Sequence, residues 1–419
     1  MSVEQTEAVV VGASASGLLT AIHLAEAGMP VRVIEQGEAT NTADRTLIVT
    51  HHLRKFLPTQ CQGCIVGEVG GFELYANGLV SSITLNEPDL VIERSRLIAD
   101  LANHARSLGV DVVENAKCVG LRRRQDGFAV SIGNGGRVSE ITTTFLVGAD
   151  GSFSAVAKGA GLSPLPTVPL VQAIVETPED LSPETSRIWF RPDDTSFFYW
   201  LVQHRDGRSV VGLIGDPGSA PRRKLDRFLV ERRLVPIEYQ SARIPSSTRR
   251  SHVGRRREGA GLYLVGDAAG HVKISTVGGV VSGFAGAAAT ARAILGTGGR
   301  RALRSLESEL ALHRLVRRVI KSFDVEDYCR LLDSLNAEAI SLLGEVSRDE
   351  LGLLLRRLIV RRPQLLAIAL RTMSRRNVKQ VADVRPTLDA GSGWPSDPAE
   401  VKAPSAEPLL GTADSGVDR

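Results

Sequence analysis

The chain has 419 residues, of which 43% are hydrophobic and 23% charged, values that are typical of a globular protein with one large or two medium domains. The formal net charge of +4 is small for this length, so composition gives no reason to expect a nucleic-acid partner. The N-terminus lacks the basic and apolar regions of a signal peptide, and no apolar run approaches the roughly 20 residues of a membrane span. We therefore expect a cytoplasmic protein.

The four cysteines do not form the framework of a small secreted protein. Cys61 and Cys64 have the spacing of a metal or redox pair, but no second pair completes a zinc site. We favour two incidental thiols in a loop and expect no metal.

A strand, a glycine-rich turn and a helix open the chain. Ala8–Val11 predicts the strand, Gly12–Gly17 the turn and Leu18–Ala27 an amphipathic helix. A second strand, Val31–Ile34, ends at an acidic residue, Glu35. This pattern is the dinucleotide fingerprint, in which the helix N-terminus faces a pyrophosphate and the acidic residue accepts hydrogen bonds from a ribose.

The fingerprint gives roles to single residues. Gly12 permits the tight turn, and Gly17 lets the helix pack closely on the sheet. Ser14 replaces the usual middle glycine, and its side chain is small enough to let a phosphate approach. The expected cofactor contacts of this unit are Gly12, Ser14, Ala15, Ser16, Gly17, Glu35 and Gln36.

The following segments are expected to leave the nucleotide unit and return to it. Asn41–Leu57 contains Arg45 and predicts a helix. Gly71–Glu87 alternates apolar and polar residues, as antiparallel strands of a substrate-facing sheet do. Another helix is expected over Leu97–Leu108, with Arg94 just before it.

A second strand-to-turn element lies in the middle of the chain. Short strands are expected at Val110–Val113, Cys118–Arg122 and Phe128–Ile132. Phe145–Val147 predicts the next strand, which ends in a Gly/Asp turn that contains Asp150 and Gly151.

Residues 160–250 predict a second β-rich layer with an aromatic cluster, Phe197–Trp200. The cluster is either part of a buried sheet core or the wall of an apolar cavity that faces a planar ring. Because side chains alternate along a strand, only one of Tyr199 and Trp200 can face such a cavity.

A third strand, turn and helix follow. Leu262–Val265 predicts a buried parallel strand that ends in Gly266–Gly270, and a helix of small residues begins at Val280. The free N–H groups of the first helical turn favour an anion, whereas Asp267 favours a hydroxyl such as that of a ribityl chain. The expected cofactor contacts here are Gly266, Asp267, Ala268, Gly278 and Gly279.

The C-terminal part is expected to be helical as far as residue 376. Helices are predicted at Leu303–Phe323, Val325–Leu343 and Asp349–Met373, where apolar residues recur at i, i+3 and i+4. The last of these combines leucines with arginine pairs, which suits either an anionic membrane surface or a solvated face over a hydrophobic core. The tail, residues 386–419, is rich in Gly, Pro and Ser and is expected to be disordered.

With its three turns in this order, the sequence resembles the FAD-dependent enzymes with the para-hydroxybenzoate hydroxylase-like fold. The resemblance implies an α/β fold with α+β elements. A Rossmann-type FAD-binding domain would comprise residues 1–70, 91–160 and 251–299. An interleaved antiparallel β-sheet substrate domain would comprise residues 71–90 and 161–250, and a C-terminal helical region residues 300–380.

That group also implies functions for several positions. The first turn holds the ADP half of FAD, and Asp267 bonds the ribityl chain. Asp150, Gly151 and Arg94 border the same cofactor, and we place Arg45 with them.

Within the group the sequence is similar to the geranylgeranyl reductase family. The segment GDAAGHVKISTVGGVV matches that family's late motif at Gly266–Gly270, Val272, Thr276, Gly278 and Gly279. Ile274 stands where the family has proline, and the aromatic strand FFYWLVQH lacks the family's proline.

The resemblance implies an FAD-dependent oxidoreductase that reduces C=C bonds of an apolar polyene or isoprenoid substrate with a hydride from reduced flavin. The alternative is a monooxygenase that activates oxygen at the flavin C4a atom and hydroxylates or epoxidises its substrate, since one fold performs both reactions. A flavin-binding module without a substrate is a third interpretation, which the long β-rich layer disfavours.

The sequence has no second dinucleotide fingerprint, so the reductant is expected to be a transiently docked NAD(P)H or a protein electron donor. The catalytic residues are unknown, and the candidates are His271, Lys273, Tyr199 and Trp200.

Overall fold

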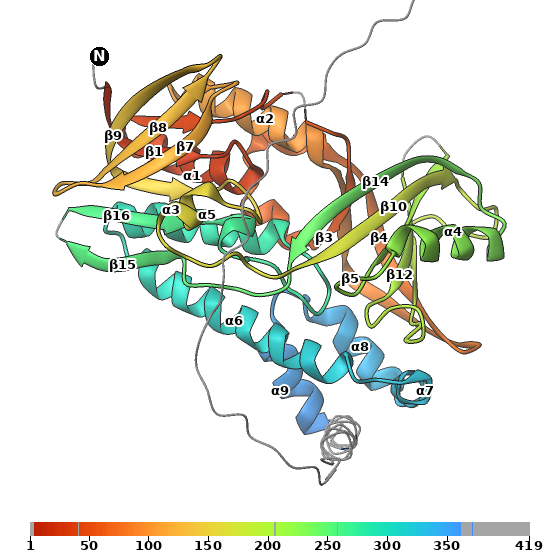
Figure 1. Cartoon of the computed structure of the whole chain (residues 1–419). Helices are drawn as coiled ribbons and strands as arrows, with labels where there is room; N and C mark the ends of the chain where they lie inside the picture. The colour runs from red at the N-terminus through yellow and green to blue at the C-terminus, as the bar shows by residue number, and fades with distance from the viewer. Residues whose placement is uncertain (1–3, 41, 205–206, 258, 362–370, 372–419) are drawn as a thin grey trace, which may run out of the picture. The chain divides into compact units, whose positions relative to one another are not determined.

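The computed structural model describes residues 4–40, 42–204, 207–257, 259–361 and 371 (Figure 1). Two eight-stranded sheets and nine α-helices make up the described residues, in agreement with the predicted α/β class. The expected disordered tail lies outside the described residues, as do residues 362–370, 372 and 373 of the predicted helix Asp349–Met373.

The first sheet contains the three predicted strand-to-turn elements. Its strand order is β15-β16-β9-β1-β2-β6, and β7 and β8 extend it beside β9. The strands are β1 Glu4–Val11, β2 Val31–Ile34, β6 Asp111–Val113, β7 Lys117–Arg123, β8 Phe128–Asn134, β9 Arg137–Gly148, β15 His252–Arg257 and β16 Ala260–Leu264. Because β1, β9 and β16 run parallel to one another, their carboxyl ends lie at one edge of the sheet.

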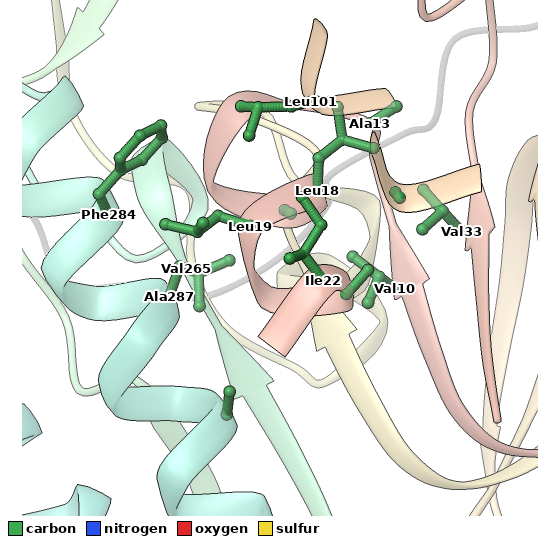
Figure 2. Packing of buried hydrophobic residues seen from close by; sticks show 14 of the residues in the cluster. Val10, Ala13, Leu18, Leu19, Ile22, Val33, Leu101, Val265, Phe284 and Ala287 are labelled. Carbon is green, nitrogen blue, oxygen red and sulfur yellow. The ribbon is translucent and has the colours of Figure 1, made fainter. Parts of the chain in front are cut away.

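The helices beside this sheet share one hydrophobic core with it. They are α1 Ala15–Glu26, α2 Arg94–Ser107 and α5 Val280–Ile294, while the short α3 Ala155–Gly159 lies against β7 and β9. Figure 2 shows Leu18, Leu19 and Ile22 of α1 between Val10 of β1 and Phe284 of α5. All five side chains are at most 1% exposed, and burying one large apolar side chain contributes about 1.5–3 kcal/mol. The first and last motifs of the sequence are thus packed into one core.

The second sheet is formed by the predicted β-rich layer together with three strands from residues 46–93. Its order is β14-β10-β13-β12-β11-β4-β5-β3, and β11 and β4 are its parallel pair. The strands are β3 Thr46–Val49, β4 Ile65–Ala76, β5 Leu79–Glu93, β10 Thr167–Glu176, β11 Thr185–Trp189, β12 Tyr199–Gln203, β13 Arg208–Ile214 and β14 Pro236–Pro245. Helix α4, Pro221–Glu231, packs on this sheet at β10 and β13 (Figure 1).

The prediction of a helix over Asn41–Leu57 was wrong. The β-branched segment Thr46–Val49 instead pairs with β5 as β3, and two 3-10 helices follow, η1 His51–Lys55 and η2 Thr59–Cys64. Both cysteines of η2 are buried near α2, and burial raises the pKa of Cys61 to about 11 and that of Cys64 to about 12. Thiols with these pKa values hold their protons at neutral pH, and they lie in a 3-10 helix rather than in the expected loop.

Four C-terminal helices are described: α6 Gly299–Ile320, α7 Val325–Asp333, α8 Ala337–Glu345 and α9 Leu351–Arg361. The prediction of one helix over Val325–Leu343 was wrong, because α7 ends at Asp333 and the Asn336 side chain caps a new helix by accepting a hydrogen bond from the Ala339 N–H. Among the helices described, none is long and apolar enough to cross a membrane.

Candidate cofactor and substrate site

The three predicted turns lie side by side at the carboxyl edge of the first sheet. Val11 of β1 pairs with Gly148 of β9, which also pairs with Leu264 of β16. The backbone pairing continues into the turns, since the Ala149 N–H donates to the Val11 carbonyl (2.7 Å) and the Val265 N–H to the Gly148 carbonyl (2.9 Å). Segments more than 250 residues apart in the sequence therefore form one edge that can contact a single cofactor.

Two glycines of the first turn allow this close approach. Gly12 has a φ of +102°, and a Cβ atom on it would lie 2.5 Å from the Ala149 carbonyl oxygen. A Cβ atom on Gly17 would lie 2.3 Å from the Gly12 carbonyl oxygen. A side chain at either position would push the first and second turns apart.

The serines of the first turn have different roles. Ser14 is the N-cap of α1, and its Oγ accepts a hydrogen bond from the Gly17 N–H at 3.2 Å. Its φ of −69° is ordinary for any residue, which explains why serine can replace glycine there. Ser16 is buried against the late turn and α5, since a Cβ atom on Gly266 or Gly283 would lie 3.0 Å or 2.5 Å from its Oγ. Ala15 begins α1, so it lies where the free N–H groups of the first turn can meet an anion.

Glu35 has the position expected of a ribose-binding acid. Its carboxylate accepts hydrogen bonds from the Ala13 N–H at 2.7 Å and from the Gly37 N–H at 3.0 Å. These bonds fix the carboxylate beside the first turn, and its oxygens retain lone pairs for a ligand hydroxyl. Gln36, the next residue, is exposed.

Asp267 of the late turn lies in the field of two arginines. Its carboxyl is buried, and burial raises its pKa while Arg45 and Arg94 oppose that rise. The two arginines come from adjoining segments, because the Arg94 N–H donates to the Arg45 carbonyl at 3.1 Å. Burial, and repulsion by Arg94, lower the pKa of Arg45 to about 10.

This arrangement fits FAD. Nε of Arg45 is buried without a hydrogen-bond partner among the described residues, and such a group is uncommon in a complete site. A ligand with phosphates and hydroxyls would supply the missing acceptor and would also bond the Asp267 carboxylate.

The middle turn contributes mainly its backbone. One Asp150 oxygen accepts from the Ser154 hydroxyl and the other from the Val156 N–H at 3.1 Å, so the carboxylate caps α3. Gly151 has a φ of +81°, which favours glycine. The turn lies against the first one, because a Cβ atom on Gly12 would be 2.9 Å from the Asp150 Cα.

The loop that follows the late turn is closed at its base. The Lys273 N–H donates to the Gly278 carbonyl at 2.9 Å, and Gly279 is the N-cap of α5. A Cβ atom on Gly279 would lie 3.7 Å from Asp267 Oδ1, so this glycine adjoins the charged group of the site. Ala268, in the same turn, is 2% exposed and packs into the core.

The two titratable candidates of this loop differ in their surroundings. His271 is fully buried, with Nε2 2.9 Å from the Ser251 hydroxyl and its ring against Gly286. Burial lowers its pKa to about 4, so the ring is neutral at pH 7, and its Nδ1 is buried without a hydrogen-bond partner among the described residues. Lys273 is also buried, but it donates a hydrogen bond to the carboxylate of Asp349.

The aromatic candidates point to opposite faces of the second sheet. Tyr199 is fully buried, stacks on Phe228 of α4 with ring centroids 4.3 Å apart, and donates to Asp194 at 3.3 Å. Trp200 lies over Gly212 on the other face and belongs to an apolar cluster with Ile274. Trp200 is therefore the residue of the pair that faces the cofactor-side loop.

Sequence reasoning missed several polar residues around this loop. Thr50 and His52 lie at η1, His313 on α6 and Asp349 just before α9. His313 Nδ1 lies 2.6 Å from the Ser275 hydroxyl, and Thr50 donates to Asp349. The residues come from three separate segments with no shared motif, so only the fold could bring them together.

Comparison with known proteins places this geometry in a wider group. The model of a family described as FAD dependent oxidoreductase matches residues 72–295. The digeranylgeranylglycerophospholipid reductase 2 of Methanothermobacter thermautotrophicus is 28% identical over 297 residues, which cover 65% of this chain and 74% of that protein. The digeranylgeranylglycerophospholipid reductase of Methanococcus vannielii is 26% identical over 294 residues, which cover 66% and 73%. An uncharacterized aromatic compound monooxygenase of Bacillus subtilis, YhjG, is 32% identical over 167 residues, which cover 37% and 33%.

Two solved structures extend the likeness over most of the chain. A geranylgeranyl bacteriochlorophyll reductase-like protein from Thermoplasma acidophilum has a TM-score of 0.70 at 18% identity and covers 88% of this chain and 100% of its own. The p-nitrophenol 4-monooxygenase of Pseudomonas putida has a TM-score of 0.56 at 19% identity and covers 88% and 98%. At these identities the likeness establishes the fold.

Proposed function

Since the chain belongs to the FAD dependent oxidoreductase family, we propose that it uses FAD to reduce C=C bonds of an apolar, isoprenoid-type substrate. Support comes from its similarity to several proteins named digeranylgeranylglycerophospholipid reductase. The expected cofactor follows from the family, and the substrate class is the proposed part.

One apolar contact supports the proposed class of substrate. Trp200 of β12 and Ile274 of the loop before Gly278 belong to a single hydrophobic cluster, together with Phe197 and Val277. Apolar side chains thus lie on both sides of the junction between the second sheet and the cofactor-side loop. Burial there would favour an apolar chain over a polar one, since removal of apolar surface from water is the driving force.

Each group of predicted contacts would bind a different part of the cofactor. The first turn and the N-terminus of α1 would hold the pyrophosphate, and Glu35 the adenosine ribose. Asp267, between Arg45 and Arg94, would hold the ribityl chain. FAD, once bound and reduced, supplies the hydride. The electrons would come from transiently docked NAD(P)H or from a protein donor.

Oxygenation of an apolar substrate is the second candidate function. It is favoured by the similarity of part of the chain to the Bacillus subtilis monooxygenase. Their sequence identity, 32% over 167 residues, is higher than the 28% over 297 residues shared with the reductase of Methanothermobacter thermautotrophicus, but it covers a shorter segment. The same residues would then bind FAD, and the apolar junction would hold the substrate.

Contact with an anionic membrane surface would accompany an apolar substrate. Helix α9 exposes Leu353, Ile359 and Val360 beside Arg356, while its other face packs in a cluster with Ala339 and Leu342 of α8. Exposed apolar side chains beside cations favour the headgroup region of such a surface. Sedimentation with phosphatidylglycerol vesicles should therefore decrease when Ile359 and Val360 are both replaced by Ser, and unchanged sedimentation would remove this part of the proposal.

An anaerobic assay separates the two candidate reactions. Photoreduced holoenzyme is incubated with a digeranylgeranylglycerophospholipid in detergent micelles, and the masses of the products are measured by mass spectrometry. A gain of two hydrogens per reduced bond without oxygen supports the reductase. A product that forms only with oxygen and carries an added oxygen atom supports the monooxygenase, and an unchanged lipid under both conditions contradicts both.

A further inference from the structure

A buried ion pair joins the cofactor-side loop to the start of α9. Lys273 donates to one carboxylate oxygen of Asp349, while Thr50 donates to the other. The side chains of Lys273 and Asp349 are 6% and 12% exposed. Two charges removed this far from water cost more than a surface pair, so their retention next to the site suggests a chemical role.

Further ionisable groups continue from this pair to the surface. Asp349 Oδ2 lies 3.6 Å from His52 Nδ1, the rings of His52 and His51 meet edge to face with centroids 4.5 Å apart, and His51 Nε2 lies 3.7 Å from Glu87 Oε2. Side-chain exposure falls steadily along the series, from 73% at Glu87 through 20%, 13% and 12% to 6% at Lys273. The groups thus form an ordered path from solvent into the interior.

The inner end of the path lies at the site. Lys273 Nζ is 3.7 Å from where a Cβ atom of Gly278 would be, and Gly278 is a predicted cofactor contact. The neighbouring residue, Ile274, packs in the cluster with Trp200. The ammonium group therefore lies between the cofactor-side loop and the segment before α9, and the next residue in the sequence, Ile274, belongs to the apolar junction.

We propose that Glu87, His51, His52, Asp349 and Lys273 form a proton relay that supplies the proton consumed in double-bond reduction. The inference rests on the proposed function. One carbon of the C=C bond takes a hydride, with its electron pair, from the reduced flavin, and the other takes a proton from the Lys273 ammonium. The π bond breaks and two C–H bonds form. Lys273 regains its proton through the relay, and NAD(P)H or the protein donor returns two electrons to the flavin.

The electrostatics suit such transfers. Burial lowers the pKa of Lys273 and Asp349 opposes this, so the ammonium is easier to deprotonate than an exposed one. The distances of 3.6 and 3.7 Å exceed a direct hydrogen bond, and the edge-to-face contact of His51 with His52 is not a hydrogen bond, so each of these three steps requires a bridging water or a small rotation. The other charged or titratable groups that act on His52, Lys273 or their neighbours are Lys55, Asp89, His313, Arg348 and Glu350.

Lys273→Arg is the decisive variant. Arginine keeps the positive charge and the pair with Asp349, but its guanidinium does not release a proton at working pH. With prereduced holoenzyme and a digeranylgeranylglycerophospholipid in micelles, turnover should fall at least tenfold in Lys273→Arg and in Lys273→Met, because general acid catalysis contributes roughly 10²–10⁴-fold. The thermal midpoint and FAD affinity of Lys273→Arg should stay close to wild type. If Lys273→Arg turned over as fast as wild type, the lysine would only anchor α9.

Arg348→Gln is the matched control. Arg348 pairs with Asp89 and ties the same segment before α9 to β5, yet it lies outside the relay. Its replacement should lower the thermal midpoint and keep turnover at pH 7 within about threefold of wild type. An equal loss of turnover in Arg348→Gln and Lys273→Arg would assign the effect to anchoring and overturn the relay.

Histidine titration tests the path without turnover. Burial lowers the pKa of His52 and the charge of Asp349 opposes this, so Asp349→Asn should lower that pKa further. NMR of histidine-labelled protein follows the titration, with His52→Gln used for assignment. An unchanged pKa of His52 in Asp349→Asn would show that the two side chains are not coupled, which would remove this step from the relay. If wild type leaves the lipid unreduced, the proposed function fails, whereas the titration still reports on the coupling. If wild type reduces the lipid and Lys273→Arg does so equally well, only the relay fails.

Discussion

The guanidinium of Arg317 lies 3.4 Å from the centroid of the Phe197 ring, so that α6 covers the segment that leads into β12. The same group donates to the carbonyl and the hydroxyl oxygen of Ser196. The Ser196 hydroxyl and N–H donate in turn to Asp216, whose charge acts on the arginine. A C-terminal helix thereby fixes the aromatic wall of the proposed substrate junction.

Replacement of Arg317 by Ala should destabilise the protein by about 2–4 kcal/mol. The change leaves the part-buried acceptors of Ser196 without their donor and removes the positive charge near Asp216. Urea unfolding at pH 7 measures the effect. Arg318→Ala is the control, because this neighbour is exposed and its loss should cost no more than about 0.5 kcal/mol. Equal midpoints for the two variants would mean that the contact contributes nothing to stability.

Replacement of Asp267 by Ala should weaken FAD binding at least tenfold. The change removes the predicted acceptor of the ribityl chain and leaves Arg45 and Arg94 without their shared carboxylate. A hydrogen bond to a charged group contributes about 1.5–3 kcal/mol, and 1.4 kcal/mol corresponds to a tenfold change in affinity. Fluorescence titration of deflavinated protein with FAD provides the measurement. Asp126→Ala, at an exposed hairpin turn, should bind as wild type does. Unaltered affinity in Asp267→Ala would remove this residue from the site.

Acidification should destabilise the protein through two buried histidines. Burial lowers the pKa of both His271 and His313 to about 4 from the usual 6.5. Between these pH values the unfolded state binds protons that the folded state excludes, so stability is retained above pH 6.5 and is lost as the pH falls toward 4. The loss between pH 7 and pH 5 is of the order of 2 kcal/mol for each histidine.

Urea unfolding at pH 7, 6 and 5 tests this dependence. His313→Gln should remove about half of the contribution, since an amide can still bond the Ser275 hydroxyl without taking up a proton. The side chain of His23 is 33% exposed, so His23→Gln should show the same pH dependence of stability as wild type. A pH dependence in His313→Gln equal to that of wild type would show that His313 is not one of the groups responsible.

The sequence was most informative where structure is local. The βαβ unit around Gly12 and Glu35 follows from spacing, because each residue type meets a geometric need within one strand, turn and helix. The parallel strands that end at Val11, Gly148 and Leu264 could be recognised one by one, and the resemblance to a family supplied their adjacency.

Contacts between distant segments could not be predicted in the same way. The segment that forms β3 was predicted to be helical, because its pairing with β5 could not be seen in the sequence. Pairing with a neighbouring strand, rather than intrinsic propensity, decides the secondary structure of such a short apolar segment. The residues around Lys273 have no common motif, because Thr50, His52 and Asp349 meet only when η1 and the start of α9 pack beside the loop. The choice between Tyr199 and Trp200 likewise required the position of α4.

Three turns that lie far apart in the sequence are expected to bind one FAD together. Hydrogen–deuterium exchange of the deflavinated protein, measured by mass spectrometry with and without FAD, tests it directly. FAD should slow exchange together in Gly12–Gly17, in the turn after Gly148 and in residues 266–279, and should leave α4 unchanged. Protection confined to one of these turns, or no protection in any of them, would contradict the single site.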